Sequence, residues 1–312
     1  MTRDRFELGD KVLRNLAARG EAGAQWLTAL PALVADLERR WNITVGDAFS
    51  TATEAYAAPA LAAEGDEVVL KISIPGVEKA QREIDVLKSA GGNGFVRLLR
   101  HDPANGAMLL ERLGPQLADA GLSIEAQIEI LCATLKQAWA MPAHGLNLLT
   151  GAQKAQRLAA DIKRVVAKFP AACSAHTAAI GLRFARERQA AFDPKSSVIG
   201  HGDAHVWNTL SDPKTGGYKF VDPEGNFIER AHDLSISMRE WPGEFLTGDP
   251  LARGRARCAL LARLTGVDAR AIWQWGLIEQ LVNGLLYKEV GSDADAAPFL
   301  AVAAAWAEAE TE

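Results

Sequence analysis

The sequence predicts an α+β protein of two lobes, a small and mainly antiparallel β-rich lobe followed by a larger helical lobe. Alternating apolar residues, typical of half-buried strands, dominate residues 41–112, whereas apolar residues three and four apart, typical of amphipathic helices, dominate after residue 113. The 312 residues also exceed the roughly 100–200 that one domain usually holds. The expected organisation is a helical extension over 1–40, the β-rich lobe over 41–112 and the helical lobe over 113–312.

The helical extension and the β-rich lobe differ clearly in pattern. Residues 1–40 carry leucines at mostly three- and four-residue steps with Pro31 as a break, which predicts two short amphipathic helices that cap the β-rich lobe. One further helix is predicted between Gly76 and the glycine-rich stretch that begins at Gly91. Strands are predicted at 43–45, 57–61, 68–74, 95–99 and 108–110.

The second lobe is helical with one interruption. Apolar periodicity predicts a helix after Ser123, which is placed as an N-cap, and further helices within 152–192 and 251–310. Between Val198 and Val221, two short β runs are joined by a turn at 212–217. The β hairpin is therefore the exceptional segment of this lobe.

Bulk properties exclude several kinds of partner. A formal net charge of −5 argues against nucleic acid, which is bound mainly by clustered Lys and Arg, and suits a small, cationic substrate better. The three cysteines lie far apart and form no C-x-x-C pattern, so reduced thiols are expected. No apolar run is long enough for a signal peptide or a membrane span. We expect a cytoplasmic monomer or homodimer without membrane partners.

The strongest chemical signal lies in the hairpin region, which reads HGDAHVWN over 201–208 and reaches Asp222 beyond the turn. Phosphoryl transfer needs a carboxylate that orients and deprotonates the attacking hydroxyl, and oxygen ligands for the Mg²⁺ ion that neutralises the phosphates. Asp203 and Asn208 match the Asp-x-x-x-x-Asn step of kinase catalytic loops. Singly, each residue would fit an ordinary turn; their order and spacing together predict Asp203 as catalytic base, with Asn208 and Asp222 as metal ligands.

A different chemistry is open to the same stretch. His201, Asp203 and His205 alternate, and such residues hold a transition metal in some hydrolases. That hypothesis leaves Asn208 and Asp222 without a role. We therefore favour His201 as a buried, hydrogen-bonded residue that braces the loop.

The β-rich lobe offers a second test of kinase chemistry, because a kinase needs a strand lysine for the nucleotide phosphates and a helix glutamate that pairs with it. Lys71 stands alone within an apolar β run, and such a lysine is costly to bury without a partner. Glu83 is the expected partner and Glu78 the alternative. The segment from Met108 to Leu113, with Glu111 and Leu113 as the candidate residues, lies where a connection between lobes would offer backbone groups to adenine. An ordinary strand end is an equally simple interpretation.

These residues resemble the aminoglycoside phosphotransferase family, whose signature is His-Gly-Asp-x-x-x-x-Asn followed by an aspartate metal ligand. The resemblance is nearest the streptomycin 6-kinase and hydroxyurea-resistance branch, over 201–208, 222–225 and 231–234. It implies a bilobal protein-kinase-like fold, with a nucleotide-binding lobe over 41–112 and a catalytic, substrate-binding lobe over 113–312. It also implies ATP and Mg²⁺ as cofactors, and Lys71 at the nucleotide phosphates. Two features depart from it: Trp207 stands where many members have a small or polar residue, and the N-terminal extension is longer than usual.

The resemblance also implies where the acceptor binds, since in this family acidic side chains of the helical lobe usually face it. An acidic surface suits a polycationic aminoglycoside, and a tryptophan can stack on a sugar ring. Candidates in this sequence are Glu224, Glu229, Glu240, Glu244 and Trp241.

The predicted function is thus ATP- and Mg²⁺-dependent O-phosphorylation of a small hydroxylated molecule, with an aminoglycoside such as streptomycin as the leading acceptor. A kinase for another metabolite, such as a sugar or an amino alcohol, is the alternative within the same class. A metal-dependent hydrolase and a nucleotide-binding pseudokinase are the other classes. The presence of Lys71, Asp203, Asn208 and Asp222 together disfavours a pseudokinase.

Overall fold

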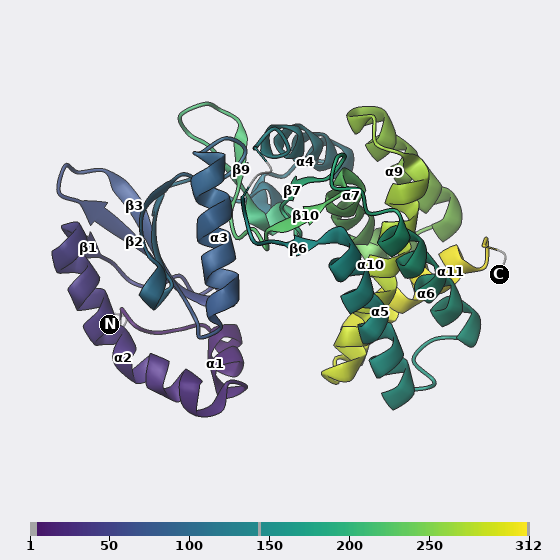
Figure 1. Cartoon of the computed structure of the whole chain (residues 1–312), viewed down its shortest axis with the longest axis horizontal. Helices are drawn as coiled ribbons and strands as arrows, with labels where there is room; N and C mark the ends of the chain where they lie inside the picture. Colours follow the sequence, from purple (N-terminus) through teal and green to yellow (C-terminus); the bar gives the residue numbers. More distant parts are fainter. Residues whose placement is uncertain (1–4, 143–144, 311–312) are drawn as a thin grey trace. The chain divides into compact units, whose positions relative to one another are not determined.

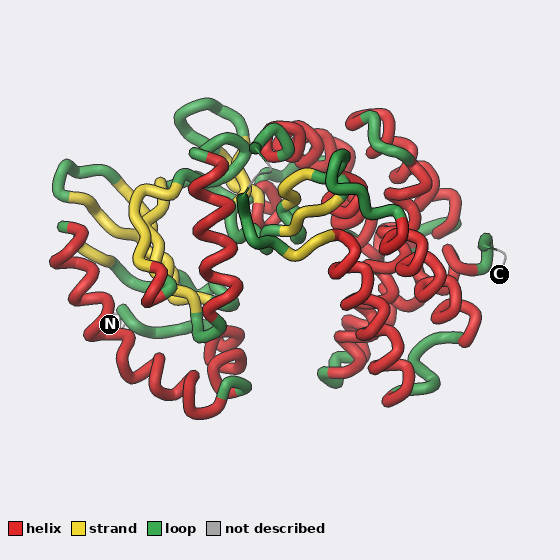
Figure 2. Tube along the Cα trace, in the orientation of Figure 1, coloured by secondary structure: helices red, strands yellow, loops and turns green. Residues whose placement is uncertain are grey.

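The computed structural model describes residues 5–142 and 145–310, apart from the side chains of 77–79. The chain divides into two compact units, the first comprising Met1–Gly114 with Asp212–Lys219 and the second Pro115–Ser211 with Phe220–Glu312. Figure 1 labels their elements, and Figure 2 shows that most of the strand lies in the first unit and most of the helix in the second.

A five-stranded antiparallel sheet forms the centre of the first unit. Its strands lie in the order β1-β2-β3-β5-β4. Within β3, Lys71 is paired with Ala57 on one side and Met108 on the other, so the lysine lies on a central strand. The strand predicted at 95–99 begins only at Leu98 and continues to Asp102. The bounds are β1 (Ile43–Val45), β2 (Ala55–Ala62), β3 (Glu67–Ser73), β4 (Leu98–Asp102) and β5 (Ala107–Glu111).

The two faces of this sheet pack against different helices. Side chains alternate along a strand, and Leu70 and Ile72 are buried in a core shared with the N-terminal helices. Lys71, between them, points to the opposite face, where it meets helix α3 (Val77–Ala90). Helix α3 ends at Gly91, which adopts φ of 57°, as the glycine-rich stretch predicted.

Helices α1 (Asp10–Ala17) and α2 (Gly20–Trp41) complete the first unit. The expectation that Pro31 separates two helices is wrong, because α2 runs through Pro31 without a break. Pro31 is exposed, so water can satisfy the carbonyl that its missing N–H leaves unpaired. Meanwhile Leu30 and Val34, on either side of Pro31, are buried against the sheet and hold the helix in place.

The second unit is built around helix α10 (Ala269–Glu289), which is buried on all sides over most of its length. Helix α7 (Arg230–Arg239), buried over most of its length, packs against it. The surrounding helices are α4 (Ile124–Ala138), α5 (Gly151–Lys168), α6 (Ala175–Ala190), α8 (Pro242–Phe245), α9 (Pro250–Thr265) and α11 (Asp293–Ala307).

Short strands frame the loop that carries the signature. Strand β10 (Asn226–Ile228) lies between β6 (Leu149–Thr150) and β7 (Val198–Gly200). Strands β8 (Thr209–Ser211) and β9 (Tyr218–Phe220) form the predicted hairpin. The sequence predicted β7 but not its partner β10, a three-residue strand. The segment 201–208 thus leaves β7, passes through the 3₁₀ turn Val206–Asn208 and enters β8.

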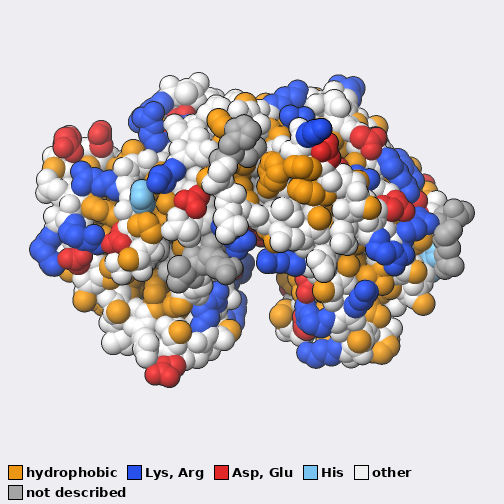
Figure 3. Space-filling view, in the orientation of Figure 1, with side chains coloured by type: hydrophobic (Ala, Val, Ile, Leu, Met, Phe, Trp, Pro, Cys, Tyr) orange, Lys and Arg blue, Asp and Glu red, His pale blue; other side chains and the backbone are white. Residues whose placement is uncertain are grey.

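The surface mixes both signs of charge. On the face in Figure 3, Lys and Arg side chains are interspersed with Asp and Glu. Within the described residues, no helix is both long enough and apolar enough to span a bilayer.

Candidate functional site

The loop after β7 is braced by the ring of His201, which is completely buried. Its Nδ1 atom accepts the backbone N–H of Asp203 at 3.1 Å, so Nε2 carries the proton and donates to the carbonyl oxygen of Val221 at 2.8 Å. Burial lowers the pKa of His201, which keeps the ring neutral. Both nitrogens are engaged within the protein, so the predicted bracing role is confirmed and His201 offers no lone pair to the metal of a hydrolase.

The backbone of this loop is held by Asp233 on α7, a fully buried carboxylate. Its Oδ2 atom accepts the backbone N–H of His201 at 3.1 Å and the indole N–H of Trp139 at 2.8 Å, and Oδ1 accepts the N–H of Gly202 at 2.8 Å. Gly202 has φ of 89°, and a Cβ there would lie 2.4 Å from Nδ2 of Asn226. In the sequence, Asp233 stood out only as part of the segment 231–234 that resembles the family. Its role follows from the structure, where its carboxylate lies inside a buried helix.

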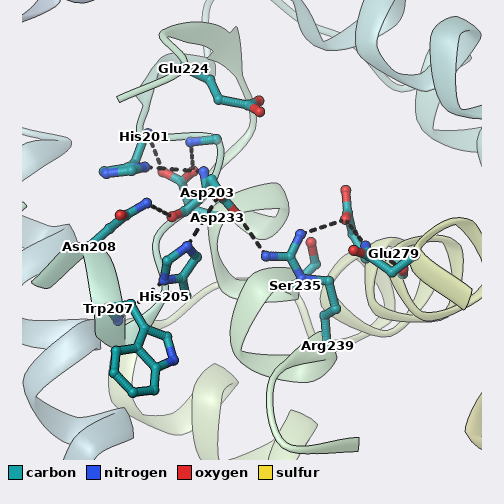
Figure 4. A network of polar contacts seen from close by, with 12 residues as sticks. His201, Asp203, His205, Trp207, Asn208, Glu224, Asp233, Ser235, Arg239 and Glu279 are labelled. Carbon is teal, nitrogen blue, oxygen red and sulfur yellow. Dashed lines mark hydrogen bonds and ion pairs between the residues drawn. The ribbon is translucent and has the colours of Figure 1, made fainter. Parts of the chain in front are cut away.

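Asp203 extends its carboxylate from this loop, as Figure 4 shows. Nη2 of Arg239 donates to Oδ1 at 2.6 Å, and Nε2 of His205 lies 3.3 Å from Oδ2. Burial opposes ionisation, but the hydrogen bond from His205 and the charge of Arg239 outweigh it and lower the pKa of Asp203. Its side chain is 32% exposed. The carboxylate is therefore ionised, fixed in direction and open to a ligand.

Arg239 belongs to a buried chain of alternating charges, which sequence reasoning missed. Its Nη1 atom lies 3.3 Å from Oε2 of Glu279 on α10. Burial acts to raise the pKa of Glu279, yet His232, whose Nε2 atom lies 3.5 Å from Oε1, and the charges of Lys154 and Arg239 lower it to about 2. The Lys154 ammonium, on α5, lies 3.1 Å from Oε2 of Glu224. Helices α5, α7 and α10 are thus joined electrostatically behind the candidate base.

Asn208 and Asp222 lie on neighbouring segments of the hairpin, because the backbone N–H of Val221 donates to the carbonyl of Asn208 at 2.9 Å. The side-chain amide of Asn208 donates to the carbonyl of Asp203 at 3.1 Å, which turns its own side-chain oxygen away from that bond. Asp222 adopts φ of 59°, a conformation that aspartate tolerates better than most residues. An amide oxygen and a carboxylate fit the oxygen preference of Mg²⁺.

In the first unit, the predicted ion pair is confirmed. The Lys71 ammonium lies 2.6 and 2.8 Å from the two carboxylate oxygens of Glu83, and both side chains are almost fully buried. The side chain of Glu78, the alternative partner, lies outside the described residues. Lys71 is therefore held on a central strand in one direction by a carboxylate from α3.

The predicted adenine segment has its side chains committed elsewhere. Oε1 of Glu111 accepts the backbone N–H of Arg97 at 2.8 Å and pairs with the Lys219 ammonium at 2.6 Å. The side chain of Leu113 is buried. Arg112, between them, is half-buried with its guanidinium over the ring of Phe49, and the backbone contact with adenine stays a prediction.

Two of the residues predicted to contact the acceptor interact with other side chains of the protein. The carboxylate of Glu229 accepts hydrogen bonds from Arg188, at 3.1 and 3.2 Å, and from the indole of Trp275 at 2.9 Å. The ring of Trp241 lies under the guanidinium of Arg257, 5.4 Å from its centroid. Glu229 and Trp241 are thus engaged within the protein while remaining half-exposed, and their contact with an acceptor stays a prediction.

The other acidic candidates differ in their surroundings. Glu224 is paired with Lys154 as described above, whereas Glu244 pairs with Arg253 and Arg257. The carboxylate of Glu240 lies close enough to Asp203 and His205 to interact with their charges, and burial raises its pKa. The charge of Glu224 also interacts with that of Asp203, so Glu240 and Glu224 both belong to the electrostatic surroundings of Asp203.

A buried strand lysine paired with a helix glutamate, and an Asp-x-x-x-x-Asn loop followed by an aspartate, together define a phosphotransferase of protein-kinase-like fold. Comparison with known proteins agrees. Residues 40–291 match the family model described as aminoglycoside/hydroxyurea antibiotic resistance kinase, and the chain belongs to that family. It is accordingly a phosphotransferase with a hydroxyl acceptor.

Individual relatives support this assignment. The chain is 30% identical to a streptomycin 6-kinase of Streptomyces glaucescens over 285 residues, and the aligned region covers 89% of each of the two chains. It is 28% identical over 294 residues to a streptomycin 6-kinase of Streptomyces griseus, with 92% of each covered. Among solved structures, choline kinase LicA of Streptococcus pneumoniae has a TM-score of 0.59 at 16% identity, covering 88% of this chain and 99% of that one. Macrolide 2'-phosphotransferase MphH of Brachybacterium faecium has 0.58 at 17%, covering 91% and 99%.

Proposed function

We propose that this chain transfers the γ-phosphoryl group of ATP, in the presence of Mg²⁺, to a hydroxyl of an aminoglycoside, with streptomycin as the first acceptor to test. The names of the two streptomycin 6-kinases to which it is similar support the acceptor. A spectinomycin phosphotransferase of the same fold was solved with ADP, which supports the nucleotide. The observation that carries the proposal is the carboxylate of Asp203, ionised, oriented by Arg239 and a third exposed.

In this proposal the first unit holds the nucleotide. Lys71, fixed by Glu83, contacts the phosphates, and the backbone of 111–113 faces the adenine. Asn208 and Asp222 hold Mg²⁺, which supplies positive charge that neutralises the phosphate oxygens.

Asp203 acts on the acceptor. Its carboxylate accepts a hydrogen bond from the attacking hydroxyl, which points the oxygen lone pair at the phosphorus atom, and it takes the proton as the new bond to phosphorus forms. Because the transition state of phosphoryl transfer is loose, orientation matters more than the strength of the base. A carboxylate with a lowered pKa is therefore suited to the task, since it is ionised at every physiological pH.

The test is a phosphate-transfer assay with ATP, Mg²⁺ and streptomycin on the wild type and on Asp203→Asn. Loss of a positioned general base should lower kcat by about 10²- to 10⁴-fold. The matched control is Asp119→Asn, an exposed aspartate of the same unit, which should be as active as the wild type. Equal turnover by the Asp203 variant would exclude this mechanism, and an inactive wild type would exclude streptomycin as the acceptor.

A further inference from the structure

Trp207 is an exposed tryptophan in the catalytic loop. All eight tryptophans of the chain lie among the described residues, and Trp207 alone is exposed, at 52%. An indole buries more apolar surface than most side chains, so leaving it in water forgoes a large gain in stability. Because Trp207 lies between His205 and Asn208, this loss of stability occurs in the loop of the candidate site.

The backbone of Trp207 is fixed on both sides. Its N–H donates to Nδ1 of His205 at 3.2 Å, and its carbonyl accepts from the side-chain amide of Gln116 at 2.9 Å. In Figure 4 the indole projects away from the amide of Asn208, beyond His205. The backbone that carries the exposed ring is therefore fixed next to His205 and does not belong to a loose loop tip.

The loop that carries the ring also carries negative charge, which suits a cation. The carboxylate of Asp203 contacts His205, two residues before Trp207, and the carboxylate of Glu240 interacts with both. Guanidinium and ammonium groups bind to the faces of tryptophan rings, and the planar guanidinium also stacks on them. The same chemistry occurs within this protein, where the guanidinium of Arg257 lies over the ring of Trp241. Trp241 already has a cation, whereas no Lys or Arg of the described residues lies over the ring of Trp207.

We propose that Trp207 is a specificity-determining residue whose ring binds a guanidinium or ammonium group of the acceptor, next to the hydroxyl that Asp203 orients. The inference rests on the proposed function and narrows its substrate class to cationic acceptors. It also moves the aromatic acceptor contact from Trp241 to Trp207.

The experiment compares Trp207→Phe, which keeps an aromatic face, with Trp207→Leu, which keeps only apolar surface. The matched control is Tyr287→Leu, an exposed aromatic of α10 at 39% exposure, outside the site. Steady-state kinetics with streptomycin give KM and kcat, and calorimetry gives the Kd of MgATP. For Trp207→Leu we expect KM for streptomycin to rise about tenfold, as a cation–π contact implies, with kcat changed by less than about threefold. Trp207→Phe should stay within about threefold of the wild type in KM.

Each outcome bears on one claim. If the wild type phosphorylates streptomycin and Trp207→Leu keeps the same KM, the inference is overturned while the proposed function stands. Equal losses in the Phe and Leu variants, or a matching loss of MgATP affinity, would show a packing role and would also overturn it. If the wild type phosphorylates no cationic acceptor, the proposed function and the inference fail together.

Discussion

Arg239 offers the sharpest test of how the site is held, because one guanidinium serves two carboxylates. Its side chain is 16% exposed, and its two terminal nitrogens lie 2.6 Å from Asp203 and 3.3 Å from Glu279. Arg239→Met keeps much of the volume and removes the charge. Removing one partner of a buried ion pair costs about 3–5 kcal/mol. Asp203 can turn toward water and Glu279 keeps the charge of Lys154, so we expect about 3 kcal/mol, the lower end of that range.

The effect on catalysis should be separate from the loss of stability. Without its donor, the carboxylate of Asp203 loses its fixed direction, and a misplacement of about 1 Å costs about 10²-fold in rate. We expect kcat to fall by about that factor, while KM for ATP stays unchanged. Arg239→Lys should be intermediate, because a compact ammonium replaces the planar fork that reaches both carboxylates.

Thermal unfolding and steady-state kinetics measure the two effects. The double variant Arg239→Met/Glu279→Gln should regain part of the lost stability, because it removes the buried carboxylate that loses the charge of Arg239, but it should not regain kcat. The control is Arg164→Ala, since Arg164 forms an ion pair with Glu289 at the surface and should matter little. Wild-type stability and kcat in Arg239→Met would refute the reasoning.

Three further changes test other parts of the site. In Asp233→Asn, an amide N–H₂ group would face backbone N–H groups whose hydrogen bonds the carboxylate accepts in the wild type. The free energy of unfolding, measured in urea, should therefore fall by about 2 kcal/mol; an unchanged midpoint would contradict the bracing role. Glu83→Gln leaves the Lys71 ammonium poorly compensated, so KM for ATP should rise about tenfold, whereas Glu67→Gln, exposed on the same strand, should not raise it. Burial raises the pKa of Glu240, so its carboxylate becomes protonated at a higher pH than that of an ordinary glutamate. KM for a cationic acceptor should therefore rise as the pH falls through the raised pKa of Glu240. If Glu240→Gln showed the same rise in KM, the pH dependence would belong to another group.

The features that the sequence predicted are those set by local pattern. Strand alternation around Lys71 and a helix that ends at Gly91 are local, and together they brought Lys71 and Glu83 to one face of the sheet. The Asp203 to Asn208 step lies within one loop. Pro31 was misjudged because tertiary burial of the residues on either side of it outweighs the propensity of proline to end a helix.

Partners distant in sequence could not be predicted in the same way. Glu229 and Glu240 are both acidic residues that follow Asp222, and nothing in the sequence shows that Glu229 rather than Glu240 meets Arg188. The same holds for Arg239, which lies 36 residues from Asp203. Such pairs depend on how whole helices pack, and that packing is decided by the core and not by the charged residues themselves.

Helix α7 shows why these distant residues matter for a reaction that consists mainly of positioning. It is ten residues long, or about 15 Å, with Asp233 in its first turn and Arg239 at its end. Asp233 holds the backbone of the loop and Arg239 holds the carboxylate of Asp203, so one rigid element sets both. The place of α7 depends in turn on Gly276 of α10, where a Cβ would lie 2.8 Å from the side chain of Met238. The direction of the candidate base is thus determined by close packing between two buried helices, at residues that never touch a substrate.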